Sequence, residues 1–187
     1  MNTQNIFLLL FLILLNGCSP KKHLDFSNIP INDKLDKFVN ELIRLGFVEP
    51  QLLNENQIKL KGDFLEKSCE IYVFGTKKSQ TAYKVRVNLP GEVQDSIEYR
   101  FDKIQQLFTS KYGTGISKYQ QFQNAERFLF NEPKRIRHLS PGDSTRYTTA
   151  SGVITLAVRN LYISITYLDK QNMEIWKRES GEVTKVD

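Results

Sequence analysis

The stretch that decides the fold is Val153-Ile-Thr-Leu-Ala-Val-Arg-Asn-Leu-Tyr-Ile-Ser-Ile-Thr-Tyr167. Apolar side chains alternate along it, in one row formed by Ile154, Leu156 and Val158 and in a second row formed by Leu161, Ile163, Ile165 and Tyr167. Such alternation is typical of strands that bury one face. Arg159-Asn160, between the rows, is predicted to be a two-residue turn. The stretch therefore predicts an antiparallel hairpin.

Two amphipathic helices are predicted N-terminal to this hairpin. The first carries apolar side chains three to four residues apart, at Leu35, Phe38, Val39, Leu42 and Leu45. We expect Asn32 or Asp33 to cap this helix and Gly46 to end it. The second carries apolar side chains at Ile97, Phe101, Ile104, Phe108 and Tyr112 and ends at Gly113. Each helix has one apolar face and therefore needs a sheet to pack on.

Further strands surround these helices. The clearest is 82–89, which places Tyr83, Val85, Val87 and Leu89 on one face and Lys84, Arg86 and Asn88 on the other. Other strands are expected at 57–61, in the second half of 64–74, and at 116–122, 127–130 and 145–149. Because short turns join neighbouring strands without crossover helices, we expect antiparallel pairing.

These elements predict an α+β fold, in which two successive helix-plus-antiparallel-strand units form one domain and the helices pack on a mainly antiparallel sheet. The units cover about 32–90 and 94–168 of a single domain at 32–187. The tail at 169–187 is predicted to form one short helix, with Asp169 as its cap and Met173 and Trp176 on one side.

The order of elements, together with the helix ending Lys111-Tyr112-Gly113, resembles the tandem repeat of the beta-lactamase-inhibitor-like fold. That fold also occurs in small exported bacterial lipoproteins. The resemblance covers most of residues 32–168. It implies a repeated helix-plus-sheet unit and, by analogy alone, an inhibitor of an exported enzyme. No functional residue is carried over from it.

The N-terminal segment is typical of an export signal. Residues 6–15 are uninterruptedly apolar, and as a helix they would span roughly 15 Å, about half of a bilayer's hydrocarbon core. Leu15-Asn16-Gly17-Cys18 resembles the lipobox of bacterial lipoproteins. The resemblance implies that 1–17 is a cleaved signal peptide and that Cys18 carries a palmitate-type lipid. An N-terminal core helix and an ordinary secretory signal are the alternatives.

We accordingly expect a lipid-anchored membrane protein of the cell envelope. Ser19, and not Asp, follows the cysteine, which favours the outer membrane over the inner membrane. The polar, proline-punctuated residues 18–31 are predicted to form a flexible tether between the lipid and the domain. Cys69 then has no intramolecular partner, and its strand position predicts a small buried hydrophobe.

The net charge of +5 favours anionic partners. At the membrane surface these are lipid headgroups, acidic polysaccharides and acidic proteins, so no nucleic acid partner is expected. No cofactor or metal is expected, because the sequence has no metal-binding cysteine or histidine motif and no glycine-rich phosphate loop ahead of a helix. With only His23, in the tether, and His138 as histidines, we do not expect an enzyme.

Three features are candidate partner-binding sites. The loop at 131–143 concentrates positive charge at Lys134, Arg135 and Arg137, beside His138. The alternative for this loop is a solvated hairpin connection that happens to be basic. The polar face of strand 82–89 offers Lys84 and Arg86, together with Tyr72 and Phe74. Trp176 either covers an edge of the core or anchors a partner.

The function predicted from these observations is a non-enzymatic binding module that binds a protein or an acidic polymer through its sheet face or its basic loop. The alternatives are a structural or assembly subunit of an envelope complex and an inhibitor of an exported enzyme. An enzyme is the least supported class, because the sequence offers no set of groups for a mechanism.

Overall fold

The computed structural model describes residues 22–90, 94–119, 139–160 and 162–181. In chain order the elements are β1 (Asp25–Phe26), β2 (Ile29–Pro30), α2 (Leu35–Arg44), β3 (Val48–Asn54), β4 (Gln57–Phe64), β5 (Lys67–Gly75), β6 (Ala82–Pro90), α3 (Gln94–Tyr112), β7 (Ile116–Lys118), β8 (Ser144–Thr148), β9 (Gly152–Arg159), β10 (Tyr162–Asp169) and α4 (Lys170–Ser180). Within these residues, no helix combines the length and the apolar composition that crossing a bilayer requires.

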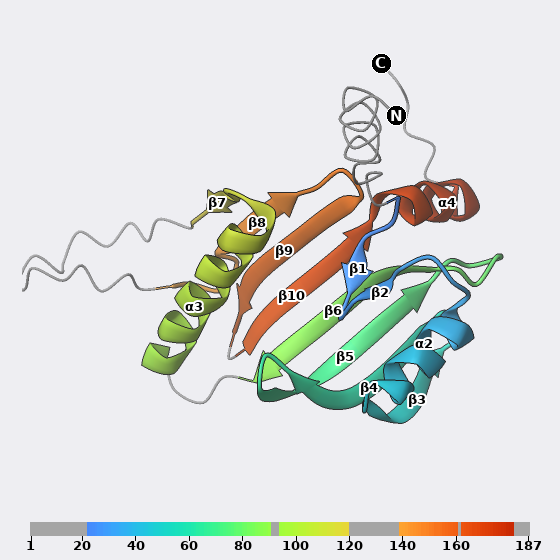
Figure 1. Cartoon of the computed structure of the whole chain (residues 1–187), viewed down its shortest axis with the longest axis horizontal. Helices are drawn as coiled ribbons and strands as arrows, with labels where there is room; N and C mark the ends of the chain where they lie inside the picture. The colour runs from blue at the N-terminus through green and yellow to red at the C-terminus, as the bar shows by residue number, and fades with distance from the viewer. Residues whose placement is uncertain (1–21, 91–93, 120–138, 161, 182–187) are drawn as a thin grey trace, which may run out of the picture.

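Eight of the strands form one sheet with the order β3-β4-β5-β6-β10-β9-β8-β7. Every neighbouring pair in it is antiparallel. Figure 1 shows β6 and β10 side by side in the middle of this sheet. The predicted α+β class with a large antiparallel sheet is therefore confirmed.

The predicted hairpin is β9 and β10, and the residues of its inward rows that the structure describes are buried, while Leu161 lies outside the described residues. Leu156 pairs with Ile165, and both side chains are fully buried. The predicted turn is wrong by one residue. Arg159 pairs with Tyr162 and so still belongs to its strand, while Asn160 begins the turn with a φ of +43°. Asparagine tolerates this left-handed conformation better than arginine does.

Helices α2 and α3 lie on the same face of the sheet, with the short β1–β2 ribbon between them (Figure 1). The buried side chains of α2 are Leu35, Phe38, Val39 and Leu42. Those of α3 are Ile97, Phe101, Ile104 and Phe108. They join one hydrophobic core with the inward side chains of the sheet, as their spacing predicts.

The predicted cap of α2 is wrong. Lys34 occupies the N-cap position, and no side chain caps the helix. Tertiary contacts take the place of a cap, because the Leu35 N–H donates to the Gln80 carbonyl at 2.6 Å and the Asp33 carbonyl accepts from Ala82 at 2.9 Å. At its other end the helix stops at Arg44 and is followed by Leu45 and Gly46. Gly46 has a φ of +97°, a conformation that favours glycine.

The predicted boundary between tether and domain is also wrong. Residues 22–31 are part of the folded domain, with Leu24, Phe26 and Ile31 buried in the core. The Phe26 ring stacks on Phe64 at 5.4 Å and meets the edge of Tyr167 at 5.2 Å between ring centroids. The free energy gained by burying these apolar side chains offsets the conformational entropy that the segment would keep as a free tether. Residues 18–21 lie outside the described residues.

Other strand predictions hold in part. Of 116–122, the structure shows a strand at Ile116–Lys118, while 120–122 lies outside the described residues; the predicted 145–149 corresponds to β8. The range 127–130 lies outside the described residues. Strand β3 was not predicted; every residue in it is exposed, and Glu49 has a φ of +53°. A strand without a buried face has no alternating apolar pattern to reveal it.

Candidate functional site

Two rows of side chains project from the middle of the sheet on the face opposite the core. Tyr72 and Phe74 come from β5, and Lys84 and Arg86 come from β6; we call these four residues the cation–aromatic patch. The intervening residues of both strands are buried in the core. The Lys84 Nζ also lies 5.6 Å from the ring of Tyr83, on which Trp176 of α4 stacks, so α4 borders the patch at one end. All four side chains of the patch are partly exposed and can contact a partner.

Strand register brings each cation onto a ring. Lys84 pairs directly with Phe74, and Arg86 pairs directly with Tyr72. The Lys84 Nζ lies 3.8 Å from the centroid of the Phe74 ring. The Arg86 Cζ lies 4.7 Å from the Tyr72 centroid and 5.5 Å from that of Phe74. Cation–π contacts of this kind hold both cations flat against the sheet.

The Glu70 carboxylate, on the same strand as Tyr72 and Phe74, is bound by Tyr72 and by Lys59. Its Oε2 accepts a hydrogen bond from the Tyr72 hydroxyl at 2.7 Å, and its Oε1 accepts from the Lys59 Nζ at 3.3 Å. The hydrogen bond from Tyr72 lowers the pKa of Glu70. Within the described residues, Glu70 forms no ion pair with Lys84 or Arg86. The patch thus keeps its positive charge.

Both cations are partly withdrawn from water. The Nε of Arg86 is buried and has no hydrogen-bond partner in the part of the chain that the structure describes. Burial, and then the charge of Arg86, lower the pKa of Lys84. A carboxylate brought against the patch would meet two partly desolvated cations, which strengthens a charge-assisted hydrogen bond.

A shallow cavity of about 490 Å³ adjoins the patch. Tyr72 belongs to both, and Lys61, Glu70, Asn88 and Tyr162 also line the cavity. Its aromatic, amide and charged groups suit the side chains of a docking surface. It extends the binding area toward one end of the strands.

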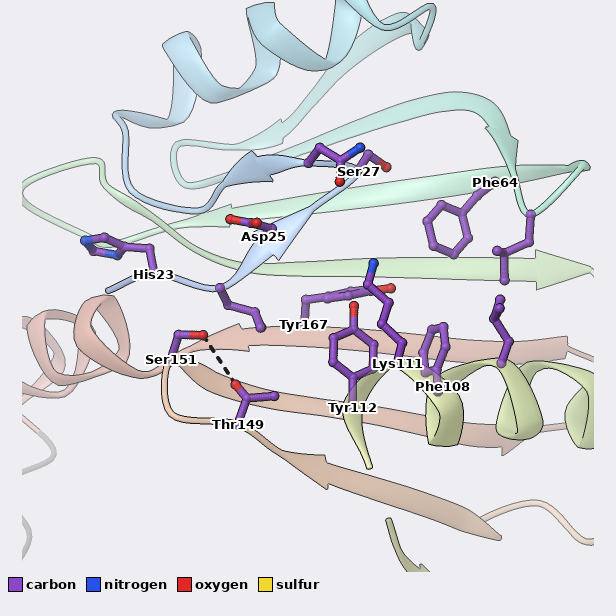
Figure 2. A pocket seen from close by; sticks show the side chains of 14 residues that line it. His23, Asp25, Ser27, Phe64, Phe108, Lys111, Tyr112, Thr149, Ser151 and Tyr167 are labelled. Carbon is purple, nitrogen blue, oxygen red and sulfur yellow. Dashed lines mark hydrogen bonds between the residues drawn. The ribbon is translucent and has the colours of Figure 1, made fainter. Parts of the chain in front are cut away.

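A second recess lies on the other, helix-bearing face. Figure 2 shows it between the β1–β2 ribbon and α3, with the rings of Phe64, Phe108, Tyr112 and Tyr167 turned toward it. We call it the aromatic cleft. It is separate from the cation–aromatic patch, because the sheet lies between them.

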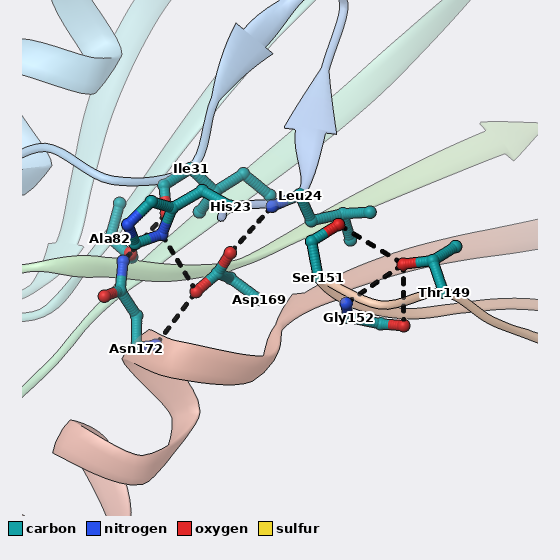
Figure 3. Close-up of polar contacts among 9 residues, drawn as sticks. All are labelled: His23, Leu24, Ile31, Ala82, Thr149, Ser151, Gly152, Asp169 and Asn172. Atoms are coloured by element: carbon teal, nitrogen blue, oxygen red, sulfur yellow. Dashed lines mark hydrogen bonds and ion pairs between the residues drawn. The ribbon is translucent and has the colours of Figure 1, made fainter. Parts of the chain in front are cut away.

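A buried polar junction ties the two ends of the described chain together (Figure 3). The Asp169 carboxylate accepts hydrogen bonds from the backbone N–H groups of Leu24 at 2.8 Å and Asn172 at 2.9 Å. The His23 Nδ1 lies 3.3 Å from the same carboxylate. The expectation that His23 belongs to a free tether is wrong, since this junction holds it. Asp169 caps α4, as predicted.

The remaining residues predicted to bind a partner or a lipid are Trp176, Cys18 and the basic loop residues. Trp176 is half-buried, and its ring stacks on Tyr83 with the centroids 5.5 Å apart. Cys18 and the basic loop residues Lys134, Arg135, Arg137 and His138 lie outside the described residues.

Groups for covalent or metal chemistry are sparse. Cys69 is 5% exposed, and burial raises the pKa of its thiol to about 11, which suits a small core side chain and not a nucleophile. Among the residues that the structure describes, no three His, Cys, Asp or Glu side chains gather to hold a metal ion.

The chain matches no protein-family model, no curated protein and no solved structure. The alternation of strand 82–89 identified the two cations and their face from the sequence. The hydrogen bonds that Glu70 accepts from Tyr72 and Lys59 were not predicted, because they depend on the register of β4, β5 and β6. Register between strands follows from cross-strand packing, and a single strand's pattern does not reveal it.

Proposed function

We propose that this protein is an exported lipoprotein, anchored in the cell envelope through Cys18, that serves as a non-enzymatic binding module. The cation–aromatic patch binds a carboxylate-bearing surface of another envelope protein. The outer membrane is the proposed location. Aromatic and arginine side chains at the centre of a flat face are what binding hot spots use.

One observation carries this proposal: on β6, in the middle of the sheet, Lys84 and Arg86 each lie against an aromatic ring of β5. The core does not require cations there. Replacing Lys84 and Arg86 by neutral side chains would leave the packing of the buried residues, such as Ile71 and Val85, in place. The cations are therefore better explained by a partner than by folding.

We further propose that the sheet consists of two helix-plus-four-strand units, as in the beta-lactamase-inhibitor-like fold. In support, α2 precedes β3 to β6, α3 precedes β7 to β10, and the last strands of the two sets meet at the centre of the sheet. Gly46 and Gly113 follow the two helices with φ angles of +97° and +82°. This arrangement gives the open face its width.

The test is capture of partners from crosslinked envelopes by the lipidated full chain. The variant Lys84→Gln/Arg86→Gln keeps the length of the side chains and removes both charges. We expect the wild type to recover one envelope protein and the variant to lose it. The matched control is Lys37→Gln/Arg44→Gln, which removes two exposed charges from α2 on the other face.

Three outcomes contradict the proposal. Equal recovery by the variant and the wild type would exclude the patch, and loss in the control as well would point to bulk charge. Retention of an acidic polysaccharide in place of a protein would assign the patch to a polymer. Thermal unfolding of each variant shows whether the domain is intact.

Anchoring has its own test. Mass spectrometry of the mature chain isolated from membranes should show a start at Cys18 and the added mass of acyl groups. A chain that retains Met1, or that starts at Cys18 without acyl mass, overturns the anchoring proposal without bearing on the patch.

A further inference from the structure

The aromatic cleft is large enough to hold a ligand. Its volume is about 460 Å³, within the range of small-molecule sites. Figure 2 shows rings from strand β10, helix α3 and the end of β4 lining one space. The rings pack on one another: Phe108 meets the edge of Tyr112 at 5.6 Å and of Tyr167 at 6.4 Å between centroids. They form an aromatic floor, beside polar lining residues that include Asp25 and Lys111.

A second hollow of about 480 Å³ continues the cleft along α3. Leu65 and Leu107 line both spaces, so the two adjoin at these leucines; we call the two spaces together the groove. Three cations line the second hollow, namely Lys67, Arg100 and Lys103; we call it the basic hollow. Within the described residues, none of the three forms an ion pair. Glu66 is the carboxylate that accompanies them among the described lining residues.

The junction between the two spaces exposes apolar side chains that folding does not require. Leu65 is 38% exposed and Leu107 is 46% exposed. Leu65 and Glu66 form the turn of the β4–β5 hairpin, with φ angles of +53° and +61°. Asparagine and glycine suit such a turn far better than leucine. Contact with an apolar ligand would account for a leucine there.

Charge decides how a ligand lies in the groove. The Asp25 carboxylate and the Lys111 ammonium both line the aromatic cleft (Figure 2), so the cleft offers an anionic group no net attraction. The cations of the basic hollow attract one at the other end. On α3, the step from Lys103 to Phe108 is roughly 8 Å at 1.5 Å per residue. A molecule with an alkyl chain and an anionic head is long enough to reach from the aromatic cleft to the basic hollow.

We propose that this groove binds a single-chain anionic amphiphile of the fatty-acid type, with its alkyl chain in the aromatic cleft and its carboxylate in the basic hollow. The site lies on the helix-bearing face, so it is independent of the cation–aromatic patch and of partner capture.

The probe for the test is a long-chain fatty acid with a photoactivatable diazirine on its chain, and its methyl ester is the uncharged comparison. The purified full-length mature protein is held in amphipol, irradiated with each probe, digested and mapped by mass spectrometry. We expect saturable adducts of the acid on the peptides that carry Leu65, Leu107 and Tyr167. The ester should label them more weakly, because it lacks the charge.

Two variants probe the two ends of the site. Leu107→Glu sets a carboxylate against the alkyl chain and should raise the half-saturating concentration about tenfold or more, and Lys103→Gln should raise it for the acid but not for the ester. The control is Leu52→Glu, at a leucine that is 67% exposed on β3. Lys84→Gln/Arg86→Gln should also leave labelling unchanged.

Labelling spread over the whole surface, equal labelling by acid and ester, or equal half-saturation for Leu107→Glu and Leu52→Glu would each overturn the proposal. The unfolding temperature of each variant shows that the fold is retained. A failure here leaves the capture experiment on the patch untouched, and the reverse also holds.

Discussion

The buried carboxylate of Asp169 accepts a hydrogen bond of 2.8 Å from the backbone N–H of Leu24, at a sequence separation of 145 residues. The last residue of β10 therefore holds the beginning of the described chain. The same carboxylate caps α4 through the Asn172 N–H at 2.9 Å. One side chain thus joins the N-terminal segment, the central sheet and the C-terminal helix, so the segment next to the proposed anchor is part of the folded domain.

Asp169→Asn should lower the free energy of unfolding by about 2 kcal/mol. The amide keeps one acceptor oxygen, but its NH₂ group then faces a backbone N–H that loses its partner. Urea denaturation followed by circular dichroism measures the change. Asp33→Asn, at an exposed carboxylate beside Lys37, is the control and should change stability by less than about 0.5 kcal/mol. Equal effects would contradict the role of the junction.

Phe26→Ala should cost about 3–5 kcal/mol, because it empties a fully buried position at the centre of an aromatic cluster. The control is Leu52→Ala at an exposed leucine. Denaturation curves of the two variants compare them directly. If residues 22–31 were a free tether, Phe26→Ala would unfold at the same urea concentration as Leu52→Ala.

The sequence predicted those parts of the fold that have one buried and one exposed face. The strand at Ala82–Pro90 and the helix at Gln94–Tyr112 were found because their apolar residues repeat with the period of the element. The ribbon β1–β2 was missed because it has only two residues per strand. Its burial depends on Phe64 and Tyr167, which lie far away in the sequence.

The candidate site was likewise predicted only where a single strand's pattern reveals it. The alternation at Lys84 and Arg86 predicted that both cations share a face. That each cation covers an aromatic ring depends on the pairing of β5 with β6. The aromatic cleft was not anticipated, because residues from β1, β4, α3 and β10 come together only in the folded chain.

Cys69 should react slowly with iodoacetamide in the native protein at about pH 8 and rapidly in urea. The burial that raises its pKa from 9.0 to about 11 withholds the thiolate. Because the folded-state pKa is the higher one, its contribution to stability is complete below pH 9.0 and is lost as the pH rises toward about 11. Mass spectrometry of timed samples follows the alkylation. Fast native labelling would show that the thiol is exposed.

Trp176→Ala separates the two roles predicted for this residue. Loss of the ring stacked on Tyr83 should lower the free energy of unfolding by about 2 kcal/mol, since the tryptophan is half-buried. Partner capture by the folded variant should be unchanged. Unchanged stability together with lost capture would make Trp176 a partner anchor instead of a cover for the core.

Site-specific crosslinking tests the proposed binding face most directly. A benzophenone-bearing phenylalanine replaces Tyr72 in the cation–aromatic patch or, as the matched control, Tyr99, which is 63% exposed on α3. Irradiation of intact envelopes should join the position-72 chain to one envelope protein and give no such product from position 99. A protein adduct from position 99 alone, or the same adduct from both positions, would contradict the assignment of the open sheet face as the binding surface.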